Sequence, residues 1–334
     1  MTYDWDTLLP LVFAGLMGLS ILIYVVLDGF DLGIGILFAG ADDDEKDVMI
    51  SAIGPFWDAN ETWLVLAVGL LLVAFPIAHG IILTALYIPV FLLLVGLILR
   101  GVAFDFRAKV PQRRKYRWNF LFMAGSLLAA LAQGYMLGIY VLGLDLSPAA
   151  IGFGALVAVC LAAAYAAMGA AWLIYKTEGE LQKKAVVLLR SALIFTAGGM
   201  AAVSLATPFA SPRIFDKWFV WPEFAFLAPL PVLSGVLFLV LFLMTFRLPK
   251  PGDRHALLPF LILAAIFALG FAGLAYSFYP YVVPDRLTIW DAASATDSLA
   301  IILVGTLFVL PVIIGYSFYA YRVFGGKATD LGYH

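Results

Sequence analysis

This sequence of 334 residues has few charges, three histidines and a single cysteine. Charged residues make up only 13% of it, and 64% are hydrophobic, whereas soluble domains carry about 25% charged residues. Cys160 alone excludes an internal disulfide and any cluster ligated by several cysteines. The composition therefore excludes a soluble globular protein and predicts a chain that crosses a membrane several times.

The few histidines are poorly placed to hold a cofactor inside a bilayer. His79 is expected beside a turn, His255 in a connection between helices, and His334 at the end of the chain. A bis-histidine haem or a copper site within the bilayer needs imidazoles at membrane depth. We therefore expect this chain to bind no haem or metal, so that the metal of any redox complex would lie in another chain.

The first residues also lack the sequence pattern of a signal peptide. The first residues, MTYDWD, are acidic and lack the basic region and small-residue cleavage site of such a peptide. The first apolar run is therefore expected to be a retained helix.

Long apolar runs are what the sequence has in abundance. A helix crosses a bilayer with about 20 residues, and nine segments are long enough: 8–39, 49–75, 77–104, 119–142, 149–175, 186–208, 223–246, 256–279 and 296–324. None shows the alternation of a barrel strand. We predict an all-α polytopic membrane protein of nine transmembrane helices, with two four-helix bundles and a peripheral helix. Residues 1–334 are expected to form a single integral membrane domain.

Basic residues between these segments predict the orientation. They are concentrated after the third, fifth and seventh segments and near the C-terminus: Arg107, Lys109, Arg113, Arg114, Lys115, Arg117, Lys176, Lys183, Lys184, Arg247, Lys250, Arg254, Arg322 and Lys327. Connections that follow even-numbered segments hold far fewer. By the positive-inside rule the N-terminus lies outside and the C-terminus lies in the cytoplasm.

Charged residues within the predicted spans are the main anomaly. An ionised acid near the centre of a membrane helix costs about 2.5 to 3.5 kcal/mol, so such acids usually face protein or water and usually have a function. They lie near the predicted cytoplasmic ends of the first three segments: Asp28, Asp31, Asp58, Glu61, Arg100 and Asp105. Counted from Met49, Asp58 would lie about 13 Å into its helix. We expect all six side chains to share one depth and to face one another.

Spacing and charge balance predict a proton route. Asp58 and Glu61 are three residues apart, as are the two acids of the first segment, so each pair shares a helix face. Arg100, expected to be the only cation within the membrane, can neutralise one or two of five carboxylates. Desolvation is expected to hold the others protonated, as a proton path requires. Neighbours that can hold bridging water are Asn60, Thr62 and Ser51.

A purely structural interpretation fits the same residues. Paired acids and arginine can fix the register of packed helices, and Arg100 with Asp105 is interpreted as such an ion-pair lock. Gly29, Gly33 and Gly35 are interpreted as close-packing positions, because no strand precedes them as in a dinucleotide-binding fingerprint.

Several motifs resemble those of a known family. They are DGFDLGIGIL at 28–37, PFWDANETWLV at 55–65, RGVAFDFR at 100–107 and YPYVVPDRLTIWDAAS at 279–294, followed by LVGTLFVLPVIIGY and YRVFGGK. From end to end the chain resembles subunit II of the cytochrome bd type quinol oxidases, especially the cyanide-insensitive branch. One departure is Ala59, where the family commonly has glycine.

This resemblance implies a partner that carries the cofactors. In the family, subunit I holds two haems of b type and one of d type and binds quinol, while subunit II holds none. The complex oxidises quinol and reduces dioxygen to water in the bacterial inner membrane. The expected contacts of this chain are subunit I, membrane lipids, a small accessory subunit and a bound quinone, and not nucleic acid.

The resemblance also implies that subunit II contributes to the proton pathway from the cytoplasm. Asp58, in the motif WDAN, is the main candidate. The other pathway candidates are Glu61, Asp28, Asp31, Asn60 and Asp105, with Arg100 as the structural ion pair.

Two other functions fit parts of the sequence. The chain could be an inert scaffold of the oxidase, or an independent proton-coupled transporter. A transporter is disfavoured because its ion site would lie at the midplane between paired broken helices, whereas the acids here are expected on one side.

Overall fold

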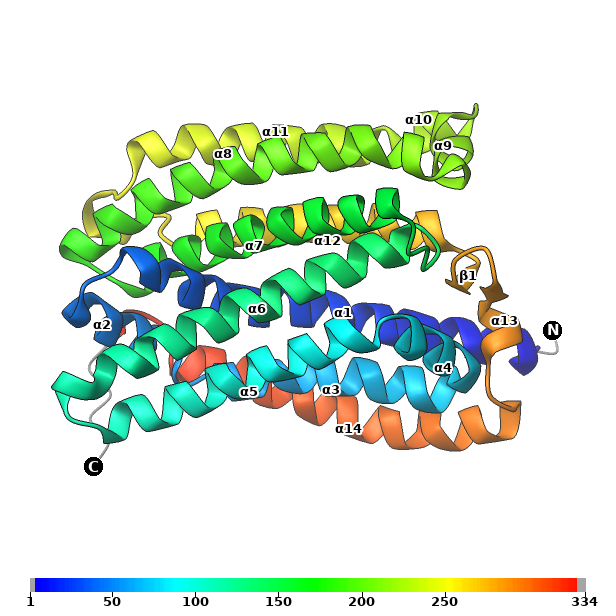
Figure 1. Ribbon diagram of the computed structural model, residues 1–334, viewed down its shortest axis with the longest axis horizontal. Helices are drawn as coiled ribbons and strands as arrows, with labels where there is room; N and C mark the ends of the chain where they lie inside the picture. The colour runs from blue at the N-terminus through cyan, green and yellow to red at the C-terminus, as the bar shows by residue number, and fades with distance from the viewer. Residues whose placement is uncertain (1–3, 329–334) are drawn as a thin grey trace.

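The computed structural model of the protein describes residues 4–328, so His334 lies outside the described residues. Within them, nine helices are long and apolar enough to cross a membrane, and they run side by side along the long axis (Figure 1). The predicted all-α fold of nine membrane helices is confirmed. Helix α1 begins and helix α14 ends at opposite ends of this axis.

The elements follow one another with short connections. The membrane-crossing helices are α1 (Trp5–Leu37), α3 (Trp57–Ala74), α5 (Tyr87–Lys109), α6 (Lys115–Val141), α7 (Pro148–Lys176), α8 (Gly179–Ala210), α11 (Pro229–Met244), α12 (Leu258–Phe278) and α14 (Thr296–Val323). The shorter helices are η1 (Phe38–Gly40), α2 (Asp43–Ile53), α4 (Pro76–Ala85), η2 (Gln112–Arg114), α9 (Pro212–Phe219), α10 (Glu223–Leu227), η3 (Thr245–Arg247), η4 (Pro251–Asp253) and α13 (Ile289–Ala292). Strands β1 (Tyr281–Val283) and β2 (Leu287–Thr288) pair as an antiparallel hairpin.

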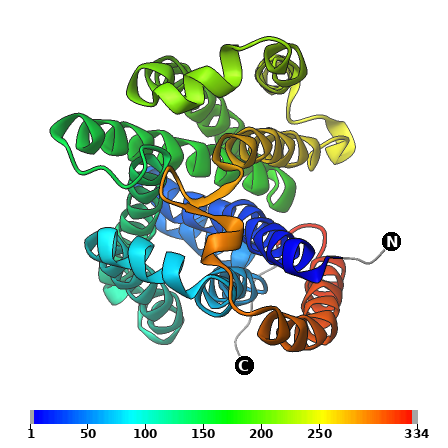
Figure 2. The same ribbon diagram turned by 90° about the vertical axis from the view of Figure 1, so that its right-hand side faces the viewer.

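Helix α1 is central and packs against α3, α6 and α7, as the end view also shows (Figure 2). The approach of α1 to α7 depends on glycine, because a Cβ on Gly33 would lie 1.8 Å from the carbonyl oxygen of Tyr165. A Cβ on Gly29 or Gly35 would also clash, with the Tyr165 ring at 2.7 Å and with Ser126 Oγ at 2.1 Å. The interpretation of these glycines as close-packing positions is confirmed.

Two of the predicted spans contain breaks. The segment 49–75 divides into α2 and α3, because Pro55 has no N–H to continue the helix after Ile53. Asp58 therefore lies in the first turn of α3, and the depth predicted by counting from Met49 is wrong. The segment 77–104 likewise divides at Leu86, where Pro89 cannot donate a hydrogen bond to the Ala85 carbonyl.

The connections rich in lysine and arginine lie together at one end of the molecule, which we call the basic end. It comprises the α5–α6, α7–α8 and α11–α12 connections and the end of α14 (left in Figure 1). Acidic α2 also lies here, where Asp47 contacts Arg107 at 2.6 Å and Lys115 at 3.0 Å. Burial raises the pKa of Asp47, but the hydrogen bonds from Lys115 and Arg107 outweigh it, and the pKa is below its ordinary value. These pairs attach α2 to α5 and α6.

Candidate functional site

A buried ion-pair network joins three helices in the half of the molecule nearer the basic end. Nη1 of Arg100 on α5 lies 2.6 Å from Oδ1 of Asp28 on α1, and Nη2 lies 3.1 Å from Oε1 of Glu61 on α3. The side chains of Arg100 and Asp28 are fully buried, and that of Glu61 is 25% exposed. Arg100 thus pairs with two carboxylates.

A second set of contacts links Asp31 to the last turn of α14. Nδ2 of Asn60 donates to Oδ2 of Asp31 at 2.7 Å, and the Tyr321 hydroxyl donates to Oδ1 of Asn60 at 2.9 Å. The ring of Tyr321 stacks on Phe56 with 4.5 Å between the centroids. Asp31 and Asn60 are almost fully buried, so α1, α3 and α14 meet at a buried polar contact.

A third set of polar side chains extends from the ion pair into the bundle. Tyr165 on α7 donates to Oε1 of Gln133 on α6 at 2.7 Å, and the Gln133 amide donates to the Tyr24 hydroxyl at 2.8 Å. Tyr24 lies one turn before Asp28 on α1. Sequence reasoning missed these three residues and Tyr321. The position of Tyr24, four residues before a buried acid, was the signal that could have found the first of them.

Two predicted members of the cluster point elsewhere. Asp58 is exposed on α3, and Asp105 is exposed on α5; neither makes an ion pair with any described residue. The prediction that all six charged residues face one another is wrong for these two. The predicted lock between Arg100 and Asp105 is also wrong, since five residues along a helix turn a side chain about 140° away.

The hydroxyls of Thr62 and Ser51 do not face the cluster either. Thr62 donates to the Ala59 carbonyl at 2.6 Å and Ser51 to the Asp47 carbonyl at 3.0 Å, each within its own helix. Their predicted role as holders of bridging water loses its geometric basis.

The buried cluster retains polar atoms with no protein hydrogen-bond partner among the described residues. They include Oδ2 of Asp28, Oδ1 of Asp31 and Nε of Arg100. Buried groups of this kind are the usual partners of internal water. Three carboxyl groups, those of Asp28, Asp31 and Glu61, surround one guanidinium, so the cluster can hold a proton without leaving a buried charge uncompensated.

Arg100 is not the only basic side chain within the spans, contrary to the prediction. Arg190 on α8 donates to the hydroxyl and the carbonyl of Thr245. Lys176 at the end of α7 is buried and donates to the Phe324 carbonyl at 2.7 Å. Only Arg100 has carboxylate partners among these three.

Possible metal ligands are scattered in the structure. His79 lies in α4 and His255 in the α11–α12 connection. In residues 4–328 no group of three or more His, Cys, Asp or Glu side chains is placed to hold a metal ion.

Comparisons with known proteins match this chain over nearly its full length. The bd oxidase of Geobacillus thermodenitrificans has a similar fold, with a TM-score of 0.77 over 95% of this chain and 98% of that one at 18% identity. Cytochrome bd-I ubiquinol oxidase subunit 2 of Escherichia coli K12 is 27% identical over 94% of this chain and 93% of the relative. Cytochrome bd ubiquinol oxidase subunit 2 of Bacillus subtilis is 28% identical, covering 97% and 96%. Because the model of the cytochrome bd terminal oxidase subunit II family matches residues 9–324, the chain belongs to that family.

Proposed function

We propose that this chain is the non-haem subunit of a quinol oxidase, that it supports the haem-bearing subunit and that it contributes to the proton pathway. Family membership makes it a multi-pass protein of the bacterial inner membrane and a member of a haem-containing terminal oxidase complex. A subunit II implies a partner subunit I. The curated relatives are named ubiquinol oxidase subunits, which supports quinol as the reductant of the complex.

The observation that carries the proposal is the exposure of Asp58 beside a partly exposed Glu61 on α3. A carboxylate in a membrane helix is costly when it faces lipid, so such acids face protein or a water-filled cavity. Residues 4–328 leave the Asp58 side chain exposed and cover that of Glu61 only in part. The partner subunit is therefore the element that covers this face of α3.

Helix α14 belongs to the same face. It lies next to α3 in both views (Figures 1 and 2), and only 6% of its apolar window is buried. The chain nonetheless holds it at both ends, through Ser294, which donates to the Val73 carbonyl, and through Tyr321. Its large exposed side chains include Ile301, Val304, Leu307, Phe308 and Val312. An apolar helix held in place but left uncovered fits a surface that docks on the haem-bearing subunit.

The acids of this face are the proposed proton carriers. Asp58 and Glu61 lie at the surface that meets the partner, while Arg100 holds Asp28 just behind them. Asp31 is held by Asn60 one turn further along α1. Haem bound by the partner subunit would supply the reduction of oxygen, and the carboxyl oxygens of this chain would take up and release the protons that the reaction consumes.

Asp105 lies outside this arrangement and is not needed for the route. The basic end, from which protons would enter, is predicted to be cytoplasmic by its lysines and arginines.

Replacing the exposed acid tests the proposal. In the Asp58→Asn complex we expect unchanged haem content and oxygen consumption slowed by about tenfold or more, since positioned proton-transfer groups typically contribute about 10² to 10⁴ in rate. Asp44→Asn, an exposed acid on α2 without a described ion pair, is the matched control and should keep full turnover. Unchanged turnover of Asp58→Asn across a range of pH would eliminate the relay and leave an inert scaffold.

Purification of the chain distinguishes the proposed oxidase subunit from an independent transporter. The chain is expected to co-purify with a haem-bearing polypeptide and to show its visible absorption. A chain that purifies alone, colourless and stable would favour the transporter.

A further inference from the structure

Arg190 is a membrane-level cation without an acidic partner. Its Nε donates to the Thr245 hydroxyl at 3.1 Å and its Nη2 to the Thr245 carbonyl at 2.9 Å, and its guanidinium lies 4.1 Å from the centroid of the Phe246 ring. These contacts are all with neutral groups. No ion pair within residues 4–328 includes Arg190 or the exposed Arg247 two residues after Thr245. The positive charge is therefore left to a group outside this chain.

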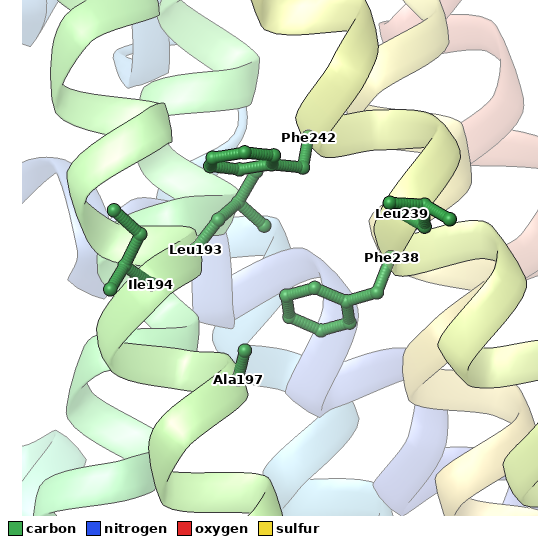
Figure 3. Close-up of a pocket in the computed structure, with 6 residues that line it drawn as sticks. All are labelled: Leu193, Ile194, Ala197, Phe238, Leu239 and Phe242. Carbon is green, nitrogen blue, oxygen red and sulfur yellow. The ribbon is translucent and has the colours of Figure 1, made fainter.

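An apolar groove begins one turn from Arg190. It has a volume of about 330 Å³ and lies between α8 and α11, whose side chains line it. Figure 3 shows side chains of both helices facing the space between them, with the rings of Phe238 and Phe242 on α11 opposite Leu193 and Ala197 on α8. Ile194 and Leu239 complete the lining. Leu193 follows Arg190 by three residues and Phe242 precedes Thr245 by three, so the guanidinium marks the end of the groove nearer the basic end.

Arg190 lies at the level where a membrane span ends. The span that contains α11 ends at Arg247, and the connection that follows carries Lys250 and Arg254. Helix α8 begins eleven residues before Arg190, at Gly179, and so extends about 16 Å beyond this level. The position is that of lipid headgroups, with the groove leading from it toward the bilayer interior.

We propose that the α8–α11 groove binds an anionic phospholipid, with the phosphate at Arg190 and Arg247 and one acyl chain along the groove. Phosphate is a strong acceptor for guanidinium groups, and basic pockets between membrane helices bind anionic headgroups. The acyl chain contacts only apolar side chains in the groove.

A second groove lies on the other side of α8. Its volume alone does not make it a site for an anionic lipid. It is larger, about 560 Å³, and it is lined mainly by small and apolar residues that include Cys160, Gly199 and Ala202. No charged side chain lines either groove, but the contacts of Arg190 with Thr245 and Phe246 hold its guanidinium on the α11 side of α8, next to the first groove. The second groove serves as an internal control.

Lipid retention by the intact oxidase complex tests the site. The complex is equilibrated with equal amounts of phosphatidylglycerol and phosphatidylcholine, and the retained lipid is measured by native mass spectrometry. We expect phosphatidylglycerol to be preferred, and Arg190→Gln to lower the preference about fivefold, the usual effect of one basic side chain at a membrane surface. Arg190→Lys keeps the charge and should keep the preference. Arg113→Gln removes an exposed charge from the same end of the molecule and should change nothing.

A groove-filling substitution gives an independent measurement. Ala197→Phe should lower the retained phosphatidylglycerol, whereas Ala202→Phe, the same change in the second groove, should not. Equal retention of the two lipids, or an unchanged preference in Arg190→Gln, would overturn the proposal. So would a photoreactive side chain at Ala197 that cross-links to a polypeptide instead of a lipid.

Discussion

At the scale of single residues, Arg100 organises the acids of the site. Its guanidinium contacts carboxylates from two other helices, Asp28 on α1 and Glu61 on α3, and it is fully buried. A buried ion pair adds little net stability over a packed apolar core, but removal of one partner leaves an uncompensated charge. We therefore expect Arg100 to be required for folding, whatever the acids do in proton transfer.

Arg100→Leu is expected to prevent assembly of the oxidase. It leaves Asp28 and Glu61 without their cation and should lower the free energy of unfolding by about 3 to 5 kcal/mol. The measurement is the yield of complex and its haem content, with Arg113→Leu as a control at an exposed arginine. Full haem content in the Arg100→Leu complex would contradict this role.

At the scale of helices, glycines let neighbouring helices approach backbone to backbone near the functional residues. Gly33 on α1 faces the backbone of Tyr165 and Gly169 on α7. A similar crossing joins α5 to α6, where a Cβ on Gly125 would lie 2.6 Å from the Gly96 carbonyl oxygen. The α5–α6 crossing lies beside the buried arginine, because a Cβ on Gly125 would also lie 2.8 Å from the backbone nitrogen of Arg100.

Gly33→Ala should separate α1 from α7. The added methyl cannot be placed 1.8 Å from a carbonyl oxygen, so the backbone must move, at a cost of about 3 kcal/mol for overpacking. Gly15→Ala on the same helix meets nothing within 4 Å and should leave stability unchanged or slightly raised. Thermal unfolding of the purified complex measures both variants. Equal Tm values would show that the α1–α7 crossing tolerates a side chain.

At the scale of the whole molecule, two opposite sides differ in chemistry. Helices α3 and α14 lie on one side and α8 and α11 on the other (Figures 1 and 2). The first side exposes Asp58 together with the nearly uncovered α14. The second is apolar, with Arg190 and the exposed Arg247 near one end of a groove. We therefore assign the first side to the partner subunit and the second to lipid.

Cysteine cross-linking distinguishes the two sides. The chain has one native cysteine, so Cys160→Ala provides a cysteine-free background. Val312→Cys on α14, where valine is 70% exposed, should cross-link to the haem-bearing subunit. Val236→Cys on α11, where valine is 50% exposed, should not. Cross-links from Val236→Cys alone would reverse the assignment.

Some of this architecture could be predicted from local properties of the sequence. Hydrophobic length predicted nine spans, because each helix must cover the bilayer with its own residues. The pairing of Arg100 with acids followed from the cost of isolated charges at membrane depth. The break before α3 was missed although Pro55 signalled it, because the apolar run continues through the proline.

The sequence by itself determined that residues 4–328 hold nine helices long and apolar enough to cross a membrane, that acids lie near the ends of three of them and that the chain belongs with haem-containing oxidases, because hydropathy and motifs are local. Only the tertiary structure decided which acids meet. Asp58 is exposed, whereas the partly exposed Glu61 reaches the buried Arg100, and Asn60 contacts Tyr321, which lies 261 residues further along the chain. The physical reason is that contacts across a bundle depend on the rotation of each helix about its own axis, and packing against the neighbouring helices sets that rotation.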